Sequence, residues 1–249
     1  MAAAFAVVMG VSVGLSVEEQ IKRWIPARFY YRQKIAKVTR NGEPELRFLP
    51  DLVPVGCTAI DVGANRGYYS YALAELAARV EAFEPHPELA RFARQKLGAA
   101  IPVHEIALSN TSGWTTLFVP QAERGVDVHF NSSIKKVYAF DTYVEFRVPM
   151  KTLDEFAFKN VGFIKIDTEG SDMDIIEGAA KTIERDRPNM VVELLAVTHA
   201  DPLACIRQIK DRFDYDAWIV LGDRMVDATD AVANLSRSKD DCNVVFTPR

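Results

Sequence analysis

The sequence predicts an α/β fold in which a mostly parallel sheet carries helices on both faces. From residue 55 onward, short apolar segments alternate with segments of helical periodicity, and a glycine-rich turn follows the first apolar segment. Strands that alternate with helices of about 10–15 residues form βαβ units with right-handed crossovers. The 249 residues are 49% hydrophobic, which suffices for one large domain with an N-terminal extension. The predicted architecture is therefore Rossmann-like.

The first two strand–helix pairs follow directly from the apolar pattern. Residues 58–62 form a short apolar run that ends in the glycine-rich turn, which predicts a strand. Residues 68–78 then carry apolar side chains at helical spacing. The run at 79–83 predicts a second strand, and the segment at 87–97 again has the spacing of a helix.

The middle of the chain departs from this alternation. Residues 103–108 predict a third strand, which turns at 109–113 into a further strand at 114–119. Residues 120–150 show no clear period. Because long loops in compact domains are usually functional or disordered, we expect this segment to cover the substrate as a lid.

The alternation resumes in the last third of the domain. Residues 163–167 predict a strand, 171–185 a helix, 189–195 a strand and 202–213 a helix. Two late strands are expected at residues 217–221 and 243–246. These elements complete the predicted sheet.

Two segments precede the predicted domain, which we place at residues 51–249. Residues 1–17 carry no charge and are weakly apolar, so we expect either a disordered end or a weak membrane anchor. Residues 18–50 form a basic segment in which aromatic side chains lie between lysines and arginines. We interpret it as a solvated helix that covers one edge of the domain. The alternative is a contact, through residues 1–40, with an anionic membrane surface or substrate.

Charge and cysteine content limit the partners and the compartment. The net charge of −4 is opposite in sign to the field that holds a phosphate backbone, so no nucleic-acid partner is expected. The three cysteines, Cys57, Cys205 and Cys242, are far apart and lack the spacing of metal ligands. They argue against a disulfide framework and a zinc site, and they indicate a reducing, cytoplasmic compartment.

The glycine-rich turn predicts a ligand at the end of the first strand. Gly63 and Gly67 allow a close backbone approach, and Glu84 ends the next strand, 21 residues after Gly63, where it can accept hydrogen bonds from ribose hydroxyls. Asn65 replaces the second glycine of the dinucleotide pattern. Asp61 suits an ammonium or sulfonium group rather than a pyrophosphate. S-adenosylmethionine carries a ribose, an α-amino group and a sulfonium, so it is the expected cofactor.

Two carboxylates follow the strand at 163–167. Asp167 and Glu169 are two residues apart, so in extended chain they point to the same side, and Gly170 permits a turn into the next helix. Either could remove a proton from a hydroxyl during methyl transfer. Alternatively, Asp167 holds the sulfonium side of the cofactor, the pair binds Mg²⁺, or Lys165 forms an ion pair with one of them. Mg²⁺ is possible here, but no metal site is expected.

Other polar residues are candidates for the base and for the acceptor site. His199 follows the fifth predicted strand at the ligand-bearing end of the sheet, and histidine is a common base. His129, Asn131 and Ser132 lie in the segment without a period, where they could bind a polar acceptor. We therefore name His199 as a third catalytic candidate and the other three as substrate-binding candidates.

Six motifs together resemble the FkbM family of methyltransferases. The two most specific are Asp-Val-Gly-Ala-Asn from residue 61 and Ile-Lys-Ile-Asp-Thr-Glu-Gly from residue 164. The likeness extends over roughly residues 42–200. The motifs lie at residues 61–70, 83–85, 148–154, 163–170, 177–179 and 187–193.

The resemblance implies a class I methyltransferase sheet of seven strands, with the last strand antiparallel to the rest. It also implies O-methylation of hydroxyls on sugars, glycolipids or polyketide-type metabolites. Carried over to this sequence, Glu84 would hold the ribose and Ala107 would lie near the adenine. Four residues of the first motif would line the methionine and ribose end of the cofactor: Asp61, Gly63, Asn65 and Gly67.

The sequence thus predicts an S-adenosylmethionine-dependent O-methyltransferase acting on a small-molecule or glycan hydroxyl, in a carbohydrate, glycolipid or secondary metabolite. One alternative is a cofactor-binding protein without transfer activity. Against this alternative, the acidic residues that the chemistry requires are all present: Asp61, Glu84, Asp167 and Glu169. A second alternative, a nicotinamide-dependent oxidoreductase, fits the glycine turn less well. The Asn/Asp-Pro-Pro-aromatic motif of nucleic-acid N-methyltransferases is absent.

Overall fold

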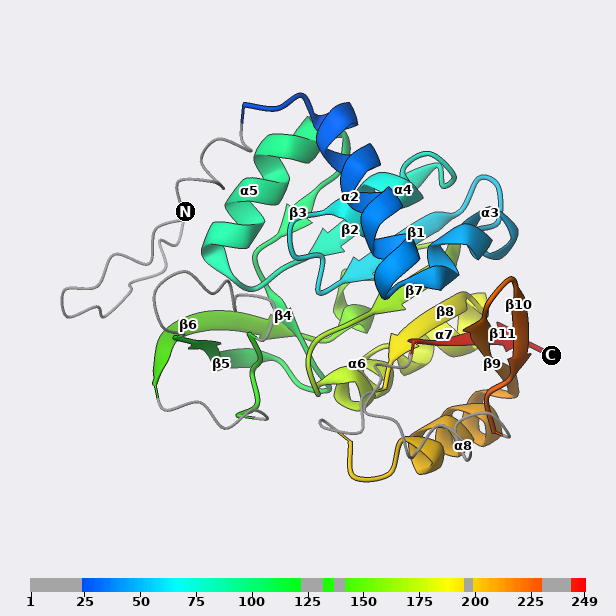
Figure 1. The fold of residues 1–249 in the computed structure, drawn as a ribbon. Helices are drawn as coiled ribbons and strands as arrows, with labels where there is room; N and C mark the ends of the chain where they lie inside the picture. The colour runs from blue at the N-terminus through cyan, green and yellow to red at the C-terminus, as the bar shows by residue number, and fades with distance from the viewer. Residues whose placement is uncertain (1–23, 122–131, 137–141, 195–198, 230–242) are drawn as a thin grey trace.

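The computed structural model describes residues 24–121, 132–136, 142–194, 199–229 and 243–249. They form a mixed sheet covered by helices and a smaller sheet beside it (Figure 1). The large sheet has eight strands in the order β10-β9-β11-β8-β7-β1-β2-β3. Its strands are β1 (Thr58–Val62), β2 (Arg79–Phe83), β3 (Val103–His104), β7 (Val161–Ile166), β8 (Asn189–Glu193), β9 (Tyr215–Leu221), β10 (Arg224–Asp227) and β11 (Asn243–Pro248).

The strand order reverses direction between β1 and β7. The chain proceeds from β1 to β2 and β3 on one side, and then from β7 to β8 on the other, and all neighbours in this group are parallel. Ligands of open α/β sheets bind beyond the carboxyl ends of the strands at such a switch point. The sheet therefore presents the ends of β1, β2, β7 and β8 to one common region.

The predicted α/β class with a mostly parallel sheet is confirmed, but the strand count of seven is wrong. The late strand β11 is antiparallel to both β8 and β9, as the resemblance implied. The eighth strand, β10, pairs with β9 across a two-residue turn at Gly222 and Asp223, with Gly222 at φ +61. Glycine followed by aspartate between two strands is a hairpin signal, and it was overlooked in this sequence.

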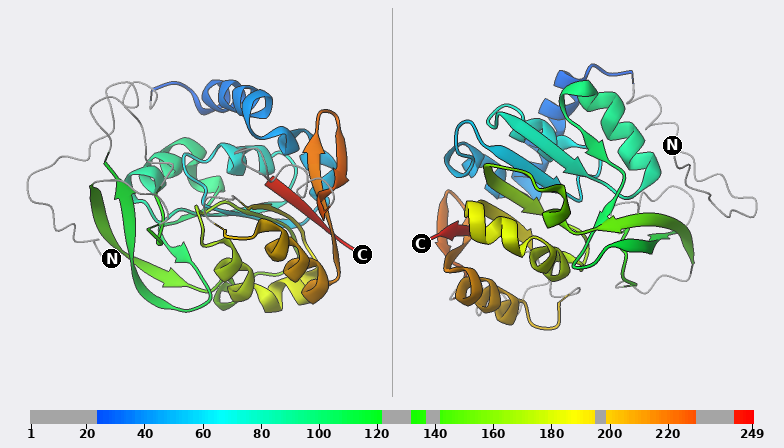
Figure 2. Two further views of the ribbon diagram at one scale, coloured as in Figure 1. Left: turned by 60° about the horizontal axis from the view of Figure 1, so that its bottom comes forward. Right: turned by 180° about the vertical axis from the view of Figure 1, so that it is seen from behind.

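Helices cover both faces of the large sheet (Figure 2). The strands alternate: Ala59 and Phe163 pack toward one helical layer, whereas Ile60 and Ile164 pack toward the other. The first layer contains α2 (Ala27–Asn41), the 3-10 helix η1 (Pro44–Phe48), α3 (Leu49–Leu52), α4 (Tyr68–Leu73), α5 (Pro87–Leu97) and the 3-10 helix η2 (Gly98–Ala100). The second contains the 3-10 helix η4 (Leu153–Phe156), α6 (Asp172–Gly178), α7 (Ala180–Asp186) and α8 (Pro202–Phe213).

Helix α2, from the predicted basic segment, packs on the domain. Tyr30 and Tyr31 form an apolar cluster with Phe92 of α5, and the Tyr31 hydroxyl donates to the carbonyl of Arg66 at 2.9 Å. Helix α3 crosses the boundary that the sequence placed between residues 50 and 51. In the described part of the chain, no helix combines the length and apolarity needed to cross a membrane. Residues 1–23, including the uncharged segment, lie outside the described residues.

The single strand predicted at residues 103–108 is wrong. β3 joins the large sheet, whereas β4 (Ala107–Leu108) joins a three-stranded sheet of order β4-β6-β5. In that sheet β5 (Gly113–Pro120) pairs with β6 (Tyr143–Lys151), which the sequence did not predict. Along β6, apolar residues alternate with charged residues and a proline, which is the period-2 pattern of a strand with one buried face. The apolar set packs in the core of the small sheet: Val144, Phe146, Val148 and Met150.

Two predicted helices differ from expectation, one because it ends early and the other because it is divided. The helix at residues 68–78 ends at Leu73, and the chain then turns back until the amide of Ala78 donates to the carbonyl of Cys57. The helix at 171–185 is divided into α6 and α7 around Ala179. At Gly178, a Cβ atom would lie 2.0 Å from the carbonyl oxygen of Ser109, so the loop after β4 approaches the helix at this point.

Candidate active site

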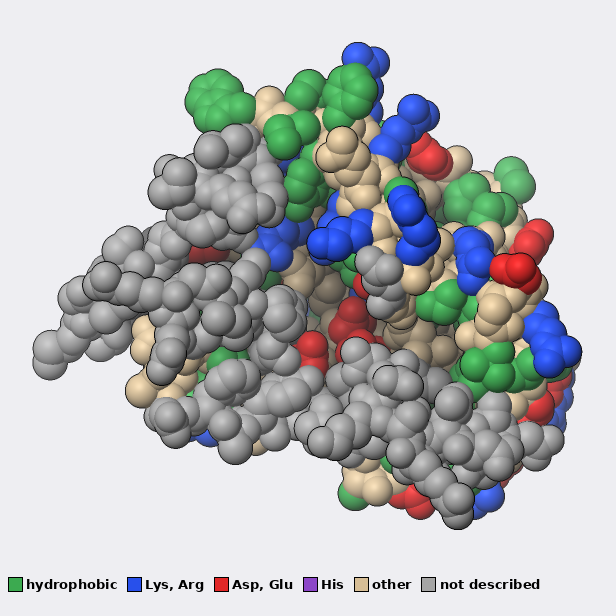
Figure 3. All heavy atoms as spheres, viewed as in Figure 1, with side chains coloured by type: hydrophobic (Ala, Val, Ile, Leu, Met, Phe, Trp, Pro, Cys, Tyr) green, Lys and Arg blue, Asp and Glu red, His purple; other side chains and the backbone are tan. Residues whose placement is uncertain are grey.

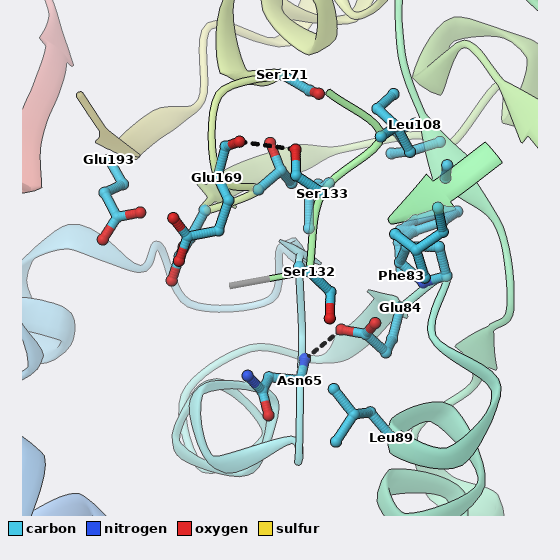
Figure 4. Close-up of a pocket in the computed structure, with 18 of the residues that line it drawn as sticks. Asn65, Phe83, Glu84, Leu89, Leu108, Ser132, Ser133, Glu169, Ser171 and Glu193 are labelled. Atoms are coloured by element: carbon cyan, nitrogen blue, oxygen red, sulfur yellow. Dashed lines mark hydrogen bonds between the residues drawn. The ribbon is translucent and has the colours of Figure 1, made fainter. Parts of the chain in front are cut away.

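A cavity of about 260 Å³ lies beyond the carboxyl ends of β1, β2, β7 and β8 (Figure 4). These strand ends bring Gly63, Glu84, Asp167 and Glu193 to its wall, and the small sheet adds Ala107. Acidic side chains are visible in the middle of the molecular face that Figure 3 shows. Because the strand order reverses here, the strand ends are adjacent and bring residues that are distant in sequence into one site.

The glycine turn brings protein backbone together beneath the cavity. Gly63 has φ +79, and a Cβ there would lie 1.7 Å from the carbonyl oxygen of Asp167. Gly67 has φ +81, and a Cβ there would lie 2.8 Å from Leu97. The sequence predicted that these glycines allow a close approach of the backbone to a ligand. In the structure, both glycines are in close contact with other parts of the protein. Gly63 lines the cavity, but Gly67 is not part of its described lining.

Glu84 is held at the end of β2 by two backbone amides. The amide of Asn65 donates to one carboxylate oxygen at 2.7 Å (Figure 4). The amide of His86 donates to the other at 2.8 Å. Burial raises the pKa of Glu84 to about 7, although both amides act to lower it. The result is an oriented carboxylate at one end of the cavity, with lone pairs still available to a ligand.

An apolar wall lies next to Glu84. Ala107, which the resemblance expects near the adenine, belongs to this wall. A flat apolar group such as a purine could lie against such a surface beside the carboxylate. The other apolar members are Phe83, Pro85, Leu89, Ile106, Leu108 and Leu117.

A buried ion pair lies at the end of β7. The ammonium of Lys165 donates to Asp167 at 2.7 Å, and Lys165 is the register partner of Asp61 on β1. Burial acts to raise the pKa of Asp167, but Lys165 outweighs it and holds that pKa below its usual range. Asp167 is therefore ionised in the ligand-free protein, and the structural ion pair considered from the sequence is present.

Glu193, at the end of β8, lies beside Asp167. Burial and the neighbouring charge of Asp167 raise the pKa of Glu193 well above its usual range. The protonated Glu193 then donates a hydrogen bond to the Asp167 carboxylate. This glutamate belongs to a motif noted in the sequence, but it was not selected there, because sequence spacing does not show that the ends of β7 and β8 meet.

Three carboxylates come close enough to share a positive charge. One oxygen each of Asp167, Glu169 and Glu193 lies within 4.8 Å of the other two. Glu169 has φ +55, so its position arises from a left-handed turn and not from the extended alternation used in the prediction. Such a set can share a proton or hold a divalent cation.

Asp172, which sequence reasoning missed, supports the turn that carries Glu169. It accepts from the amide and hydroxyl of Thr168 at 3.1 and 2.8 Å, and from the amide of Gly170 at 3.2 Å. The Nε2 atom of His199 lies 3.7 Å from an Asp172 oxygen. His199 is 8% exposed and is not part of the cavity's described lining. The structure therefore places His199 behind the turn.

Asp61 is fully buried beneath the cavity and does not belong to its described lining. One of its oxygens accepts from the hydroxyl of Ser70, whereas the other has no hydrogen-bond partner. Burial raises the pKa of Asp61, although Lys165 acts to lower it. Asp61 thus places a buried carboxyl group under the site.

The segment predicted as a lid, residues 120–150, is only partly described, and its last part forms β6. Ser132 lines the cavity, and the hydroxyl of its neighbour Ser133 donates to the carbonyl of Glu169 at 2.7 Å. His129 and Asn131 lie outside the described residues. The polar segment around Ser132 therefore borders the carboxylate end of the cavity.

Two further residues of the lining come from unexpected places. Glu43 lies between α2 and η1, in the segment that the sequence placed before the domain, and Tyr68 opens α4. The Tyr68 hydroxyl donates to Glu43. No periodicity or spacing in the sequence connects these two residues, which are brought together by the packing of α2 on α4.

Comparisons with known proteins agree with this geometry. The sequence model of a protein family, the methyltransferase FkbM domain, matches residues 61–215 of this chain. Methyltransferase FkbM from Methylobacillus flagellatus KT has a TM-score of 0.55 at 16% identity, and the match covers 83% of this chain and 48% of that one. The chain therefore spans about half the length of that protein, and the likeness shows a shared fold.

Two other solved structures are more distant. SMU.1697c of Streptococcus mutans, in complex with SAH, has 11% identity and a TM-score of 0.47, with 82% of this chain and 96% of that chain covered. An rRNA methylase from Streptococcus thermophilus has 11% identity and a TM-score of 0.46, with coverages of 82% and 94%. No curated protein matches the chain.

Proposed function

The chain belongs to the FkbM family of methyltransferases, and from this premise we propose that it is an O-methyltransferase acting on a hydroxyl of a carbohydrate, glycolipid or secondary metabolite. S-adenosylmethionine supplies an electrophilic methyl group on a sulfonium. The observation that carries the proposal is one cavity with the oriented Glu84 carboxylate at one end and the carboxylates after β7 and β8 at the other.

The donor set fits S-adenosylmethionine. Glu84 can accept hydrogen bonds from both ribose hydroxyls, and the wall that contains Ala107 can hold the adenine. Gly63 and Asn65 border the space between them and the β7 end. We therefore assign donor binding to these four residues. Asp61 and Gly67 act beneath them: Asp61 accepts a hydrogen bond from Ser70, and Gly67 gives the turn its shape.

Proton removal is assigned to the carboxylates after β7. Asp167 and Glu169 both line the cavity, so either can receive a proton from a bound hydroxyl. Lys165 keeps Asp167 ionised but also weakens it as a base. Positioning of donor and acceptor then supplies much of the acceleration. Ser132 is assigned to the acceptor, together with His129 and Asn131 from the sequence.

The experiment that tests this function follows a labelled methyl group. The protein is incubated with labelled S-adenosylmethionine and a cell extract, and the extract is then fractionated. Label in carbohydrate, lipid or small-molecule fractions, stable to mild alkali as expected for a methyl ether, would support the proposal. Alkali-labile esters, or label confined to protein or nucleic acid, would contradict it.

Calorimetry, together with the labelling experiment, distinguishes a methyltransferase from the two alternative functions, an oxidoreductase and a cofactor-binding protein without transfer activity. Binding of S-adenosylmethionine without NAD binding is expected, because the glycine turn lacks the dinucleotide pattern. NAD binding alone would favour an oxidoreductase. Donor binding with no label transferred to any fraction would favour a cofactor-binding protein without transfer activity.

We also retain the predicted cytoplasmic compartment and the contact of residues 1–40 with a membrane surface as proposals. Within this range the structure describes α2, whose outward residues include Arg28, Arg32 and Lys37 and whose sequence has no carboxylate. Phe29 is 51% exposed beside them. A basic helix with an exposed aromatic ring supports binding to anionic headgroups.

A further inference from the structure

The segment that precedes the family-matched residues contributes a carboxylate to the cavity. Glu43 lines the cavity from the connection between α2 and η1, whereas the family match begins at residue 61. One oxygen of Glu43 accepts from the Tyr68 hydroxyl. The other oxygen, Oε2, is buried and has no hydrogen-bond partner. A buried carboxylate oxygen without a partner is costly unless a ligand completes it.

Glu43 is fixed by contacts on both sides. Before it, α2 is anchored by the bond from Tyr31 to the Arg66 carbonyl. After it, Glu45 accepts from Asn243 at 2.9 Å, and Arg47 pairs with Asp223 at 2.8 Å. The position of Glu43 is therefore fixed, because the residues on either side of it contact the glycine turn and two later parts of the chain.

The electrostatics around Glu43 favour an additional cation. Burial raises the pKa of Glu43, while Lys165 acts to lower it. Lys165 faces Glu43, Asp61 and Asp167 together, and the charge of Lys34 acts more weakly on Glu43. Among the described lining residues, none is lysine, arginine or histidine. Oxygens of Glu43, Asp61 and Glu193 remain buried without a partner near this lysine.

We propose that Glu43, oriented by Tyr68, binds the α-ammonium group of the methyl donor. The proposal rests on the proposed function, because it takes the ribose to lie on Glu84. With the ribose there, the amino-acid end of the donor is left for the carboxylates around Lys165. An ammonium has three donors and a positive charge, and it can therefore complete the buried carboxylate oxygen of Glu43 that has no hydrogen-bond partner. The N-terminal segment is thus part of the donor site.

The test compares ligands with and without the amino group. Calorimetry measures the affinity of S-adenosylhomocysteine and of its deamino analogue, S-adenosyl-4-thiobutyrate. Glu43→Gln should weaken S-adenosylhomocysteine about tenfold or more, because a charge-assisted hydrogen bond is lost. It should leave the affinity of the deamino analogue within about twofold, because that ligand has no ammonium to lose.

Matched variants separate this role from a merely structural one. Tyr68→Phe keeps the ring but frees Glu43, so it should produce a smaller loss that is again selective for the amino ligand. Glu84→Gln should weaken both ligands equally, because both carry the ribose. A wild-type protein that binds neither ligand would contradict the proposed function itself. Normal binding with equal changes for both ligands in Glu43→Gln, or none, would overturn the role of Glu43 alone.

Discussion

Opposing influences on single carboxylates decide the chemistry of this site at the residue scale. Glu84 and Asp167 are both surrounded by protein, yet burial raises the pKa of Glu84 to about 7 and a lysine lowers that of Asp167. The difference is the partner: Glu84 has two backbone amides, whereas Asp167 has a full positive charge at 2.7 Å. Two acids of similar intrinsic strength are thereby given different protonation states near neutral pH.

The first prediction concerns donor affinity. Glu84→Gln should weaken S-adenosylmethionine binding by about 1–3 kcal/mol, because charge-assisted bonds to the ribose are lost. In the wild type, affinity should fall as the pH is lowered through about 7, since protonation removes the charged acceptor. Calorimetry between pH 6 and 8 measures both effects. An unchanged affinity in the variant would show that Glu84 does not bind the ribose.

The second prediction concerns the base. Asp167→Asn preserves shape but removes charge and basicity, so turnover should fall by about 10²–10⁴-fold while donor affinity barely changes. Glu169→Gln is the paired variant, and His199→Gln is the control outside the described cavity lining. A collapse confined to His199→Gln would move the base to the loop after β8. Equal and mild losses in all three would indicate catalysis by positioning alone.

The third prediction concerns metal. Activity should survive EDTA, because the carboxylates after β7 suffice as base and as donor contacts. The measurement is the initial rate with EDTA, compared with the rate after addition of Mg²⁺. The opposite outcome is chemically reasonable, since oxygens of Asp167, Glu169 and Glu193 lie within 4.8 Å of one another and could hold a metal ion. Complete loss that Mg²⁺ restores would identify the three carboxylates as a metal site.

At the scale of elements, close backbone contacts determine where helices and turns lie. Gly63 allows the turn after β1 to contact the end of β7, and Gly178 allows the end of α6 to contact the loop after β4. In the second case a helix-forming sequence is divided into α6 and α7 at the contact. Helical periodicity alone therefore overestimates the length of this element, because the neighbouring chain occupies the space that a side chain would need.

The fourth prediction follows from this contact. Helix propensity alone would make Gly178→Ala stabilising by about 1 kcal/mol. The clash with the Ser109 carbonyl should reverse the sign and destabilise the protein by about 1–3 kcal/mol. Chemical denaturation measures the difference. Gly42→Ala is the control, because no atom lies within 4 Å of a Cβ there. Stabilisation by Gly178→Ala would show that the contact is not rigid.

At the scale of the whole molecule, the packing of η1 and of the strand ends buries several carboxyl groups. The pKa of Glu45 is raised to about 8, chiefly by burial, and those of Asp61 and Glu193 are also raised. A carboxyl with a raised pKa in the folded state stabilises the protein at low pH. That stabilisation is lost as the pH rises through the folded-state pKa.

The fifth prediction is therefore a fall in stability with rising pH. Between about pH 5 and pH 8 the free energy of unfolding of the ligand-free protein should decrease. The decrease is at most about 1.4 kcal/mol per pH unit for each such group. Asp167 does not oppose this trend, since its lowered pKa lies below the window. Thermal unfolding across this range measures it, and Glu45→Gln should flatten the slope. Stability that rises toward pH 8 would contradict these protonation states.

The sequence by itself determined the fold class and the residues at several strand ends. The local sequence pattern was sufficient for β1, β2, α5 and α8. The two strands are buried on both faces and so appear as short apolar runs, whereas each helix buries one face that its spacing records. It was insufficient for β4 and β10, whose strand character arises from pairing with a neighbour, whereas β6 carries a period-2 alternation of its own. The family resemblance was likewise available from contiguous motifs and is confirmed.

Only the tertiary structure decided which side chains share the cavity. It brought Glu43, Tyr68 and Glu193 to the lining, and it placed Asp61 beneath the site and His199 behind a turn. Spacing along a chain reports the direction of a side chain relative to its own strand or helix. Whether two such directions converge depends on which strand ends are adjacent and on how distant segments pack, and these are properties of the folded sheet alone.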